Sequence, residues 1–287
     1  MNVLSIQSWV AYGHVGNAAA VFPLQRLGAE VWAINTVQFS NHTGYGSWTG
    51  RVFDARDITA LVDGIEARGV LPRCDAVLSG YMGTAETGAA ILDAVRRVRE
   101  VNADALWCCD PVIGDVGRGV FVRPGIAELM RDAAVPEADL LTPNHFELEM
   151  LTERSCGTLE AAQEAAFALQ SRMRHDGPRA LLVTSLVTAE TEGAAVDVLA
   201  VDRDRATRLV RTPRLPISVN GAGDLIAALF LLHFKRLGSA ARAAALAVSS
   251  VHAVLRATHE AGSRELLLVA AQDELVRPSI CFEALPC

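Results

Sequence analysis

The sequence has no cysteine pair with the spacing of a metal-binding or redox motif. None of its six cysteines belongs to a C-x-x-C pattern, and no histidine pair accompanies them as in a zinc site. Cys108 and Cys109 lie inside an apolar run, where we expect them to pack as small hydrophobic side chains. The cysteines therefore indicate neither a structural zinc nor a disulfide framework, and reduced thiols are expected. The six are Cys74, Cys108, Cys109, Cys156, Cys281 and Cys287.

The sequence also lacks a basic run and a long hydrophobic run. Its net charge is −7 with a pI of about 5.5, and no cluster of basic residues alternates with aromatics. This balance argues against nucleic acid or an anionic membrane as a partner. The most apolar window, 225–234, is too short to cross a bilayer, and residues 1–5 lack the start of a signal peptide. We therefore expect a cytoplasmic protein.

What is present is enough apolar sequence for a large core. The 287 residues are 51% hydrophobic, with no internal repeat or linker, so we predict one α/β domain over residues 1–287. Short apolar runs at 3–8, 30–39, 75–81, 105–112, 139–142 and 180–184 predict strands. Longer amphipathic runs at 15–27, 57–68 and 84–101 predict helices. This alternation is typical of a mostly parallel central sheet covered by helices on both faces.

The pattern changes toward the C-terminus. Strands predicted at 194–201 and 206–211 are separated by a polar turn, which indicates a short antiparallel hairpin at a sheet edge. The remaining sequence predicts helices at 225–237, 240–257 and 263–274.

The most informative segment is Asn220-Gly221-Ala222-Gly223-Asp224, directly before a predicted helix. Glycine lets the backbone approach a ligand, and free N–H groups at a helix start bind phosphates. A carboxylate there can take a proton from a hydroxyl, and we expect the helix N-terminus to stabilise its ionised form. The segment predicts phosphoryl transfer to an alcohol. These residues also leave open a plain glycine turn in which Asp224 caps the helix.

Further polar residues fall at the carboxyl ends of the predicted parallel strands, where ligands bind in open α/β sheets. This convergence predicts a site at that edge. The residues are Ser8, the segment 41–45, Tyr81, Asp110, the segment 142–144, Thr184 and Ser185.

Nearly end to end, the chain resembles the pyridoxal kinases of the ribokinase-like superfamily, most closely the bacterial dimeric type. The G-A-G-D segment at 221–224 by itself indicates only a ribokinase-like kinase, whereas Q-F-S-N-H-T at 38–43 is much more specific to pyridoxal kinases. Other matching segments are S-I-Q-S at 5–8, G-H-V-G-N at 13–17, S-G-Y at 79–81, C-D-P-V at 109–112, and T-P-N at 142–144 with Glu147.

The resemblance implies transfer of the ATP γ-phosphate to the 5′-hydroxyl of pyridoxal, which gives pyridoxal 5′-phosphate. It implies Asp224 as the general base and Gly221, Ala222 and Gly223 as the anion hole. It also implies a homodimer, and it leaves a monovalent-cation requirement open. The implied substrate pocket consists of Ser8, His42, Thr43, Gly44 and Tyr81 together with Asp224.

On the nucleotide side, the resemblance implies that Asp110 and Glu147 organise Mg²⁺ and ATP, directly or through water. The other implied ATP-binding residues are Asp115, Thr142, Asn144, Thr184, Ser185, Arg214 and Leu215.

The chain departs from the pattern of the bacterial pyridoxal kinases at four positions. Alanine is common where Thr142 stands, and some members carry lysine at Thr184, glutamine at Gly44 or a flap cysteine at Val120. The Thr184-Ser185 pair resembles the eukaryotic pattern.

Structural alternatives accompany these roles. Asp110 could rigidify the turn before Pro111, and Glu147 could favour a helix start by ~0.3–1 kcal/mol. His42 and Tyr81 could be ordinary packing residues. The glycine-containing segment 115–119 is expected to form a flap that keeps water from the γ-phosphate, with a plain surface loop as the alternative.

Two other functions stay open. One is a related kinase acting on hydroxymethylpyrimidine or a sugar, and segment 35–45 favours pyridoxal over these substrates. The other is a noncatalytic vitamin B6-binding protein, against which the intact Asp224 and its glycines argue.

Overall fold

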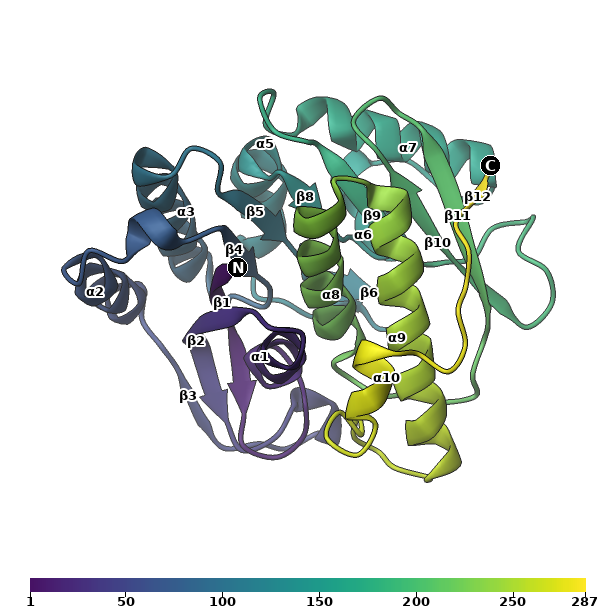
Figure 1. Ribbon diagram of the computed structural model, residues 1–287, viewed down its shortest axis with the longest axis horizontal. Coiled ribbons are helices and arrows are strands. Elements are labelled where there is room, and N and C mark those ends of the chain that lie inside the picture. The colour runs from purple at the N-terminus through teal and green to yellow at the C-terminus, as the bar shows by residue number, and fades with distance from the viewer.

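The computed structural model describes residues 1–287 and contains one ten-stranded sheet (Figure 1). Its strand order is β12-β11-β10-β9-β8-β5-β4-β1-β2-β3, and the six strands from β9 to β2 pair in parallel. The parallel strands are β1 (Asn2–Val10), β2 (Glu30–Phe39), β4 (Ala76–Ser79), β5 (Leu106–Cys109), β8 (Leu140–Leu141) and β9 (Ala180–Leu186). The predicted mostly parallel sheet is confirmed.

Helices cover both faces of this sheet. One face carries α1 (Asn17–Arg26), α8 (Ala222–Leu237), α9 (Ala240–Glu260) and α10 (Gln272–Val276). The other carries α2 (Ala55–Glu66), α3 (Ala85–Val101), α4 (Ile126–Leu129), α6 (His145–Thr152) and α7 (Leu159–Arg172). Shorter helical segments are η1 (Thr43–Tyr45), η2 (Leu71–Arg73), η3 (Met130–Ala134) and α5 (Val135–Glu137).

The strand β1 explains why its sequence is continuously apolar. Val3 packs into the core on the α8 face, whereas Leu4 and Ile6 pack into the core on the α3 face, and all three are fully buried. Because successive side chains of a strand point to opposite faces, a strand covered on both sides needs apolar residues throughout. The sheet contains strands from both ends of the chain, β1 and β12. This supports a single domain over residues 1–287, which stays a prediction.

Antiparallel strands close both edges of the sheet. The predicted hairpin is confirmed as β10 (Ala195–Val201) and β11 (Thr207–Pro213), and the two-residue β12 (Leu285–Pro286) adds outside it. At the other edge, β3 (Gly50–Val52) pairs with β2 and was not predicted. Both terminal strands are too short to give a sequence pattern.

The predicted helix at 263–274 is wrong for most of its length, because only α10 at its end is helical. The Ser263 hydroxyl bonds the backbone N–H and the carbonyl of Glu265, and the Leu267 N–H donates to Thr258 Oγ1 at 3.1 Å. These side-chain contacts replace helical hydrogen bonds. The segment can then bury both Leu266 and Leu268.

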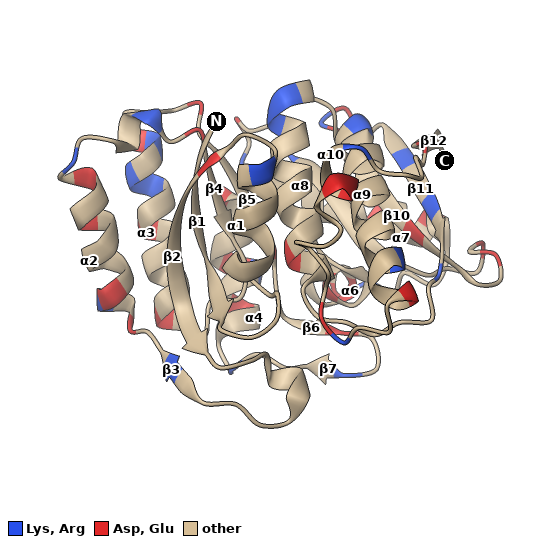
Figure 2. Ribbon diagram, turned by 60° about the horizontal axis from the view of Figure 1, so that its bottom comes forward, with Lys and Arg blue, Asp and Glu red and all other residues tan.

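No helix has the length and apolar character needed to cross a membrane. Acidic and basic residues lie interspersed over the helices (Figure 2).

Candidate functional site

The carboxyl ends of the parallel strands meet at one end of the molecule, where the small hairpin β6 (Gly114–Asp115) and β7 (Gly119–Val120) also lies (Figure 2). A cavity of about 1040 Å³ opens there. Many of the predicted site residues line it, from segments far apart in the sequence. They are His42, Gly44, Asp115, Asn144, Thr184, Ser185, Arg214, Leu215, Ala222 and Gly223.

The glycine-rich segment forms the start of α8, as predicted. Gly221 adopts a positive φ of 95°, and a Cβ at this position would lie 1.8 Å from the His14 carbonyl oxygen, so only glycine fits. The Leu225 N–H bonds the Gly221 carbonyl at 2.9 Å. The N–H groups of Ala222 and Gly223 therefore lie before the first helical hydrogen bond, where an anion can bind them.

Asp224 lies in the first turn of α8 and keeps partial exposure. Burial raises the pKa of its carboxyl to about 6, although hydrogen bonds from the backbone N–H groups of Gly16 and Asp224 itself oppose the shift. Desolvation outweighs these contacts, and the stabilisation of the ionised form by the helix N-terminus stays a prediction. A carboxyl with this pKa is well suited to act as a base near neutral pH.

Asp110 and Glu147 are buried, and Asp110 lies near both Glu147 and Asp224. Thr142 Oγ1 donates to Asp110 Oδ1 at 2.9 Å, and Thr142 is itself buried and does not line the cavity. Glu147 accepts hydrogen bonds from the backbone N–H groups of Ile113 and Asn144, each at 2.9 Å. Burial raises the pKa of Glu147 to about 7, while burial and the charges of Glu147 and Asp224 raise the pKa of Asp110.

This carboxylate group fits a divalent cation. The charges of Glu147 and Asp224 both act on Asp110, and no basic side chain offsets the charges of these three carboxylates. The chain has no cluster of three His, Cys, Asp or Glu side chains that could enclose a metal ion by themselves. Mg²⁺ needs only one or two carboxylates when water and substrate phosphates complete its shell. Asp110 and Glu147 are therefore suitable residues to hold it.

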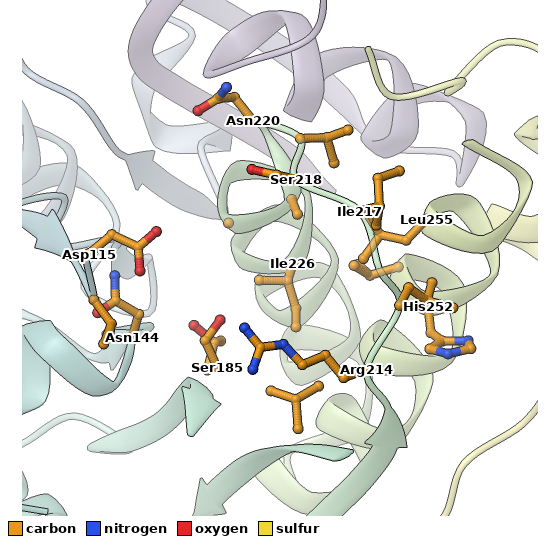
Figure 3. Close-up of a pocket in the computed structure, with 18 of the residues that line it drawn as sticks. Asp115, Asn144, Ser185, Arg214, Ile217, Ser218, Asn220, Ile226, His252 and Leu255 are labelled. Carbon is orange, nitrogen blue, oxygen red and sulfur yellow. The ribbon is translucent and has the colours of Figure 1, made fainter. Parts of the chain in front are cut away.

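One side of the cavity combines charged and polar side chains with an apolar wall. The Arg214 side chain extends into the cavity toward Ser185, and Asp115 and Asn144 lie across from it (Figure 3). Ile217, Ile226, Val248, Val251 and Leu255 form apolar walls, which suit the flat face of a nucleobase. These apolar residues were not predicted, because nothing in the sequence separates them from ordinary core residues.

Only some of the residues that the resemblance implies for the substrate pocket line the cavity. His42, Gly44 and Tyr45 line the cavity, whereas Ser8, Thr43 and Tyr81 do not. Ser8 is buried beneath Gly16, and Tyr81 is partly buried, which raises its pKa. Whether these three side chains contact a bound substrate stays a prediction.

Glu265 forms a cluster with His42 and Tyr45 that the sequence does not predict. Glu265 lies in the segment that was predicted as a helix, so no sequence signal placed it near the site. Its Oε1 accepts from Tyr45 Oη at 2.7 Å and contacts His42 Nε2 at 3.0 Å. The hydrogen bond to Glu265 raises the pKa of Tyr45 to about 12, and Arg264 stacks over the Tyr45 ring at 4.7 Å.

The predicted flap is the hairpin of β6 and β7. Arg118 at its tip pairs with Asp115 at 3.1 Å and donates to Asn220 Oδ1 at 3.4 Å. Both arginine contacts are solvent-exposed, so they hold the hairpin only weakly over the cavity. Asp115, Val116 and Arg118 of this hairpin line the cavity, and its action as a lid stays a prediction.

A parallel sheet with a Gly-Asp helix start beside a large cavity defines the class of ribokinase-like kinases of small molecules. The family model described as phosphomethylpyrimidine kinase matches residues 58–268. A protein of Granulibacter bethesdensis named pyridoxal kinase PdxY is 62% identical over 287 residues, 100% of both chains. Its namesake in Deinococcus radiodurans is 57% identical over 285 residues, covering 99% of this chain and 95% of that one. The chain belongs to the pyridoxal kinase family.

A solved structure supports the same assignment. The pyridoxal kinase of Leishmania donovani in complex with ADP and pyridoxamine superimposes with a TM-score of 0.90 at 31% identity. It covers 100% of this chain and 99% of that chain.

Proposed function

We propose that this chain transfers the γ-phosphate of ATP to the 5′-hydroxyl of pyridoxal and so forms pyridoxal 5′-phosphate. One observation carries the proposal: Asp224 stands at the start of α8 beside a cavity large enough for both substrates. The names of the full-length relatives, and the ADP and pyridoxamine bound to the Leishmania donovani enzyme, support this choice of substrates.

In the proposed mechanism, Asp224 removes the proton of the 5′-hydroxyl as its oxygen attacks phosphorus. Phosphoryl transfer depends mainly on positioning and on neutralising charge. The backbone N–H groups of Gly221, Ala222 and Gly223 and the positive end of α8 face the charge that develops on the transferred group. Arg214, whose side chain reaches into the cavity, neutralises charge on the nucleotide phosphates.

Mg²⁺ supplies further neutralisation when it is bound with ATP. Asp110 and Glu147 would hold it, directly or through water, because they are buried carboxylates without a basic partner. Thr142 orients Asp110 through its hydroxyl, and three backbone N–H groups orient Glu147. Of the other predicted ATP-binding residues, Asp115, Asn144, Thr184, Ser185 and Leu215 line the same cavity.

The chain is further proposed to be a cytoplasmic homodimer. The family resemblance carries this part, and the exposed apolar side chains of Tyr12 (62% exposed) and Trp48 (46%) offer surface that a partner can cover.

The test is ATP consumption measured with pyridoxal, pyridoxine, pyridoxamine or hydroxymethylpyrimidine as the acceptor, with phosphorylated product identified by mass. Turnover with pyridoxal that is lost in Asp224→Asn supports the proposal. Exclusive turnover of hydroxymethylpyrimidine would overturn it. This control matters because the family model begins at residue 58 and does not include segment 35–45, on which the preference for pyridoxal rests. Binding of pyridoxal without ATP consumption would instead indicate a noncatalytic protein.

A further inference from the structure

The carboxylate of Glu265 joins three loops at the substrate end of the cavity. Besides its contacts with His42 and Tyr45, its Oε2 accepts the backbone N–H of His14 at 3.3 Å. Glu265 is 8% exposed, so these contacts are made largely out of water. A buried carboxylate is stable only when such donors compensate its lost hydration.

The second contact of the His42 ring defines its protonation pattern. Asn220 Nδ2 lies 3.2 Å from His42 Nδ1, and Arg118 donates to the other amide atom, Asn220 Oδ1, at 3.4 Å. Because arginine can only donate, Asn220 must present its oxygen to Arg118 and its NH₂ group to the ring. His42 Nδ1 therefore accepts a hydrogen bond, and His42 Nε2 carries the proton that it donates to Glu265.

The neighbouring glycine is matched to this arrangement. Gly13 has a φ of 91°, and a Cβ at this position would lie 2.1 Å from Glu265 Oε2. The bare backbone of Gly13 thus gives the carboxylate room to reach the His14 N–H. The loop at 13–14, the loop at 42–45 and the segment between α9 and α10 therefore meet at the carboxylate of Glu265.

We propose that Glu265 is a positioning residue for the pyridoxal-binding side of the site: it holds His42 as the Nε2–H tautomer and fixes the segment 42–45 against the cavity. The inference rests on the proposed function for the identity of the acceptor. The hydrogen-bonded chain Arg118–Asn220–His42–Glu265 then connects the flap, the residue before the anion hole, and the substrate loop. Glu265 touches neither reacting atom, and it acts through His42 and Tyr45.

A spectroscopic experiment tests the tautomer without reference to catalysis. In two-bond ¹H–¹⁵N spectra of the ¹⁵N-histidine-labelled protein, His42 is expected to show a protonated Nε2 and an unprotonated Nδ1, with assignment from His42→Ala. In Glu265→Ala this pattern is expected to give way to a mixture of tautomers. A protonated Nδ1 in the wild-type protein would overturn the proposal.

The kinetic test separates the two substrates. In Glu265→Ala, the KM for pyridoxal is expected to rise about tenfold or more, with the KM for ATP changed less than about twofold. Glu265→Gln keeps an oxygen for His42 and Tyr45, so it is expected to restore most of the affinity. Glu260→Gln, a 66%-exposed carboxylate at the end of α9, serves as the control. An unchanged KM for pyridoxal in Glu265→Ala would refute a positioning role.

A glycine pair provides a second test if Glu265→Ala does not fold. Gly13→Ala places a methyl group on Glu265, whereas Gly28→Ala meets no atom within 4 Å at a similar φ of 83°. Backbone strain is thus comparable in the two variants. Only Gly13→Ala is expected to raise the KM for pyridoxal and to alter the His42 resonances, and equal effects of both changes would overturn the proposal. If the wild-type protein does not phosphorylate pyridoxal, the proposed function fails, while the tautomer measurement still decides the role of Glu265.

Discussion

Replacing Asp224 by asparagine should abolish most activity and at the same time stabilise the protein. Burial raises the pKa of Asp224 from 3.8 to about 6, so the folded chain holds this proton more tightly than the unfolded chain does. Above pH 6 the ionised Asp224 therefore destabilises the folded state relative to the unfolded state, in which the carboxylate is hydrated. A pKa difference of about two units corresponds to about 3 kcal/mol, and the partial exposure of Asp224 reduces the cost to about 2 kcal/mol.

The pH dependence follows from the sign of the shift. Well below pH 3.8 the carboxyl is protonated in both states and costs nothing, the cost is still small near pH 4, and above about pH 6 nearly the full cost is present. Asparagine is neutral throughout and keeps an oxygen for the Gly16 N–H. Asp224→Asn should therefore gain little over the wild type at pH 4 and about 2 kcal/mol at pH 7. Urea unfolding between pH 4 and pH 8 measures this difference. The control is Asp176→Asn, whose side chain is 88% exposed and which should give no such gain.

Activity should change in the opposite direction. Loss of the base should lower kcat by about 10²-fold or more, with ATP affinity largely kept. In the wild-type protein, kcat/KM for pyridoxal should fall as pH drops below about 6, because Asp224 becomes protonated. An Asp224→Asn variant that retains most of its kcat would refute the assignment of the base. Loss of ATP binding in this variant would favour a structural or metal-organising role, and a variant less stable than the wild type at pH 7 would refute the desolvation argument.

Three further predictions concern the metal, the nucleotide and assembly. Glu147→Gln should raise the Mg²⁺ concentration needed for half-maximal activity, whereas Glu149→Gln on the same helix, the control, should not. In the wild-type protein this Mg²⁺ concentration should rise as pH falls below about 7, because protons compete with the metal for Glu147. Full activity in EDTA would refute the metal role. Arg214→Ala should raise the KM for ATP about tenfold with little change in the KM for pyridoxal, because the Arg214 side chain extends into the cavity (Figure 3) and its guanidinium can pair with phosphate oxygens. Steady-state kinetics measures both constants, and the reverse pattern would contradict this role. Light scattering should give twice the chain mass of 30.6 kDa, and a single species of chain mass would exclude the homodimer.

The architecture and the glycine turn before α8 could be predicted from the sequence alone. Continuous apolar strands such as β1 predicted a sheet covered on both faces, because only burial on two sides tolerates apolar residues at every position. The segment 220–224 predicted the helix start and the glycine turn, and the structure places Gly221 at the positive φ that such a turn requires. These features are local, so their information lies within a few consecutive residues.

Only the tertiary structure decided how distant groups act on one another. The pKa of Asp224 depends on how completely the fold excludes water, and the segment 220–224 alone does not indicate that. Glu265 follows Asp224 by 41 positions and His42 by 223, in a segment whose composition predicted a helix. Glu265 contacts His42 and Tyr45 because the segment between α9 and α10 packs beside the loops at 13–14 and 42–45. Burial and long-range contacts belong to the folded chain as a whole, and no short stretch of sequence encodes them.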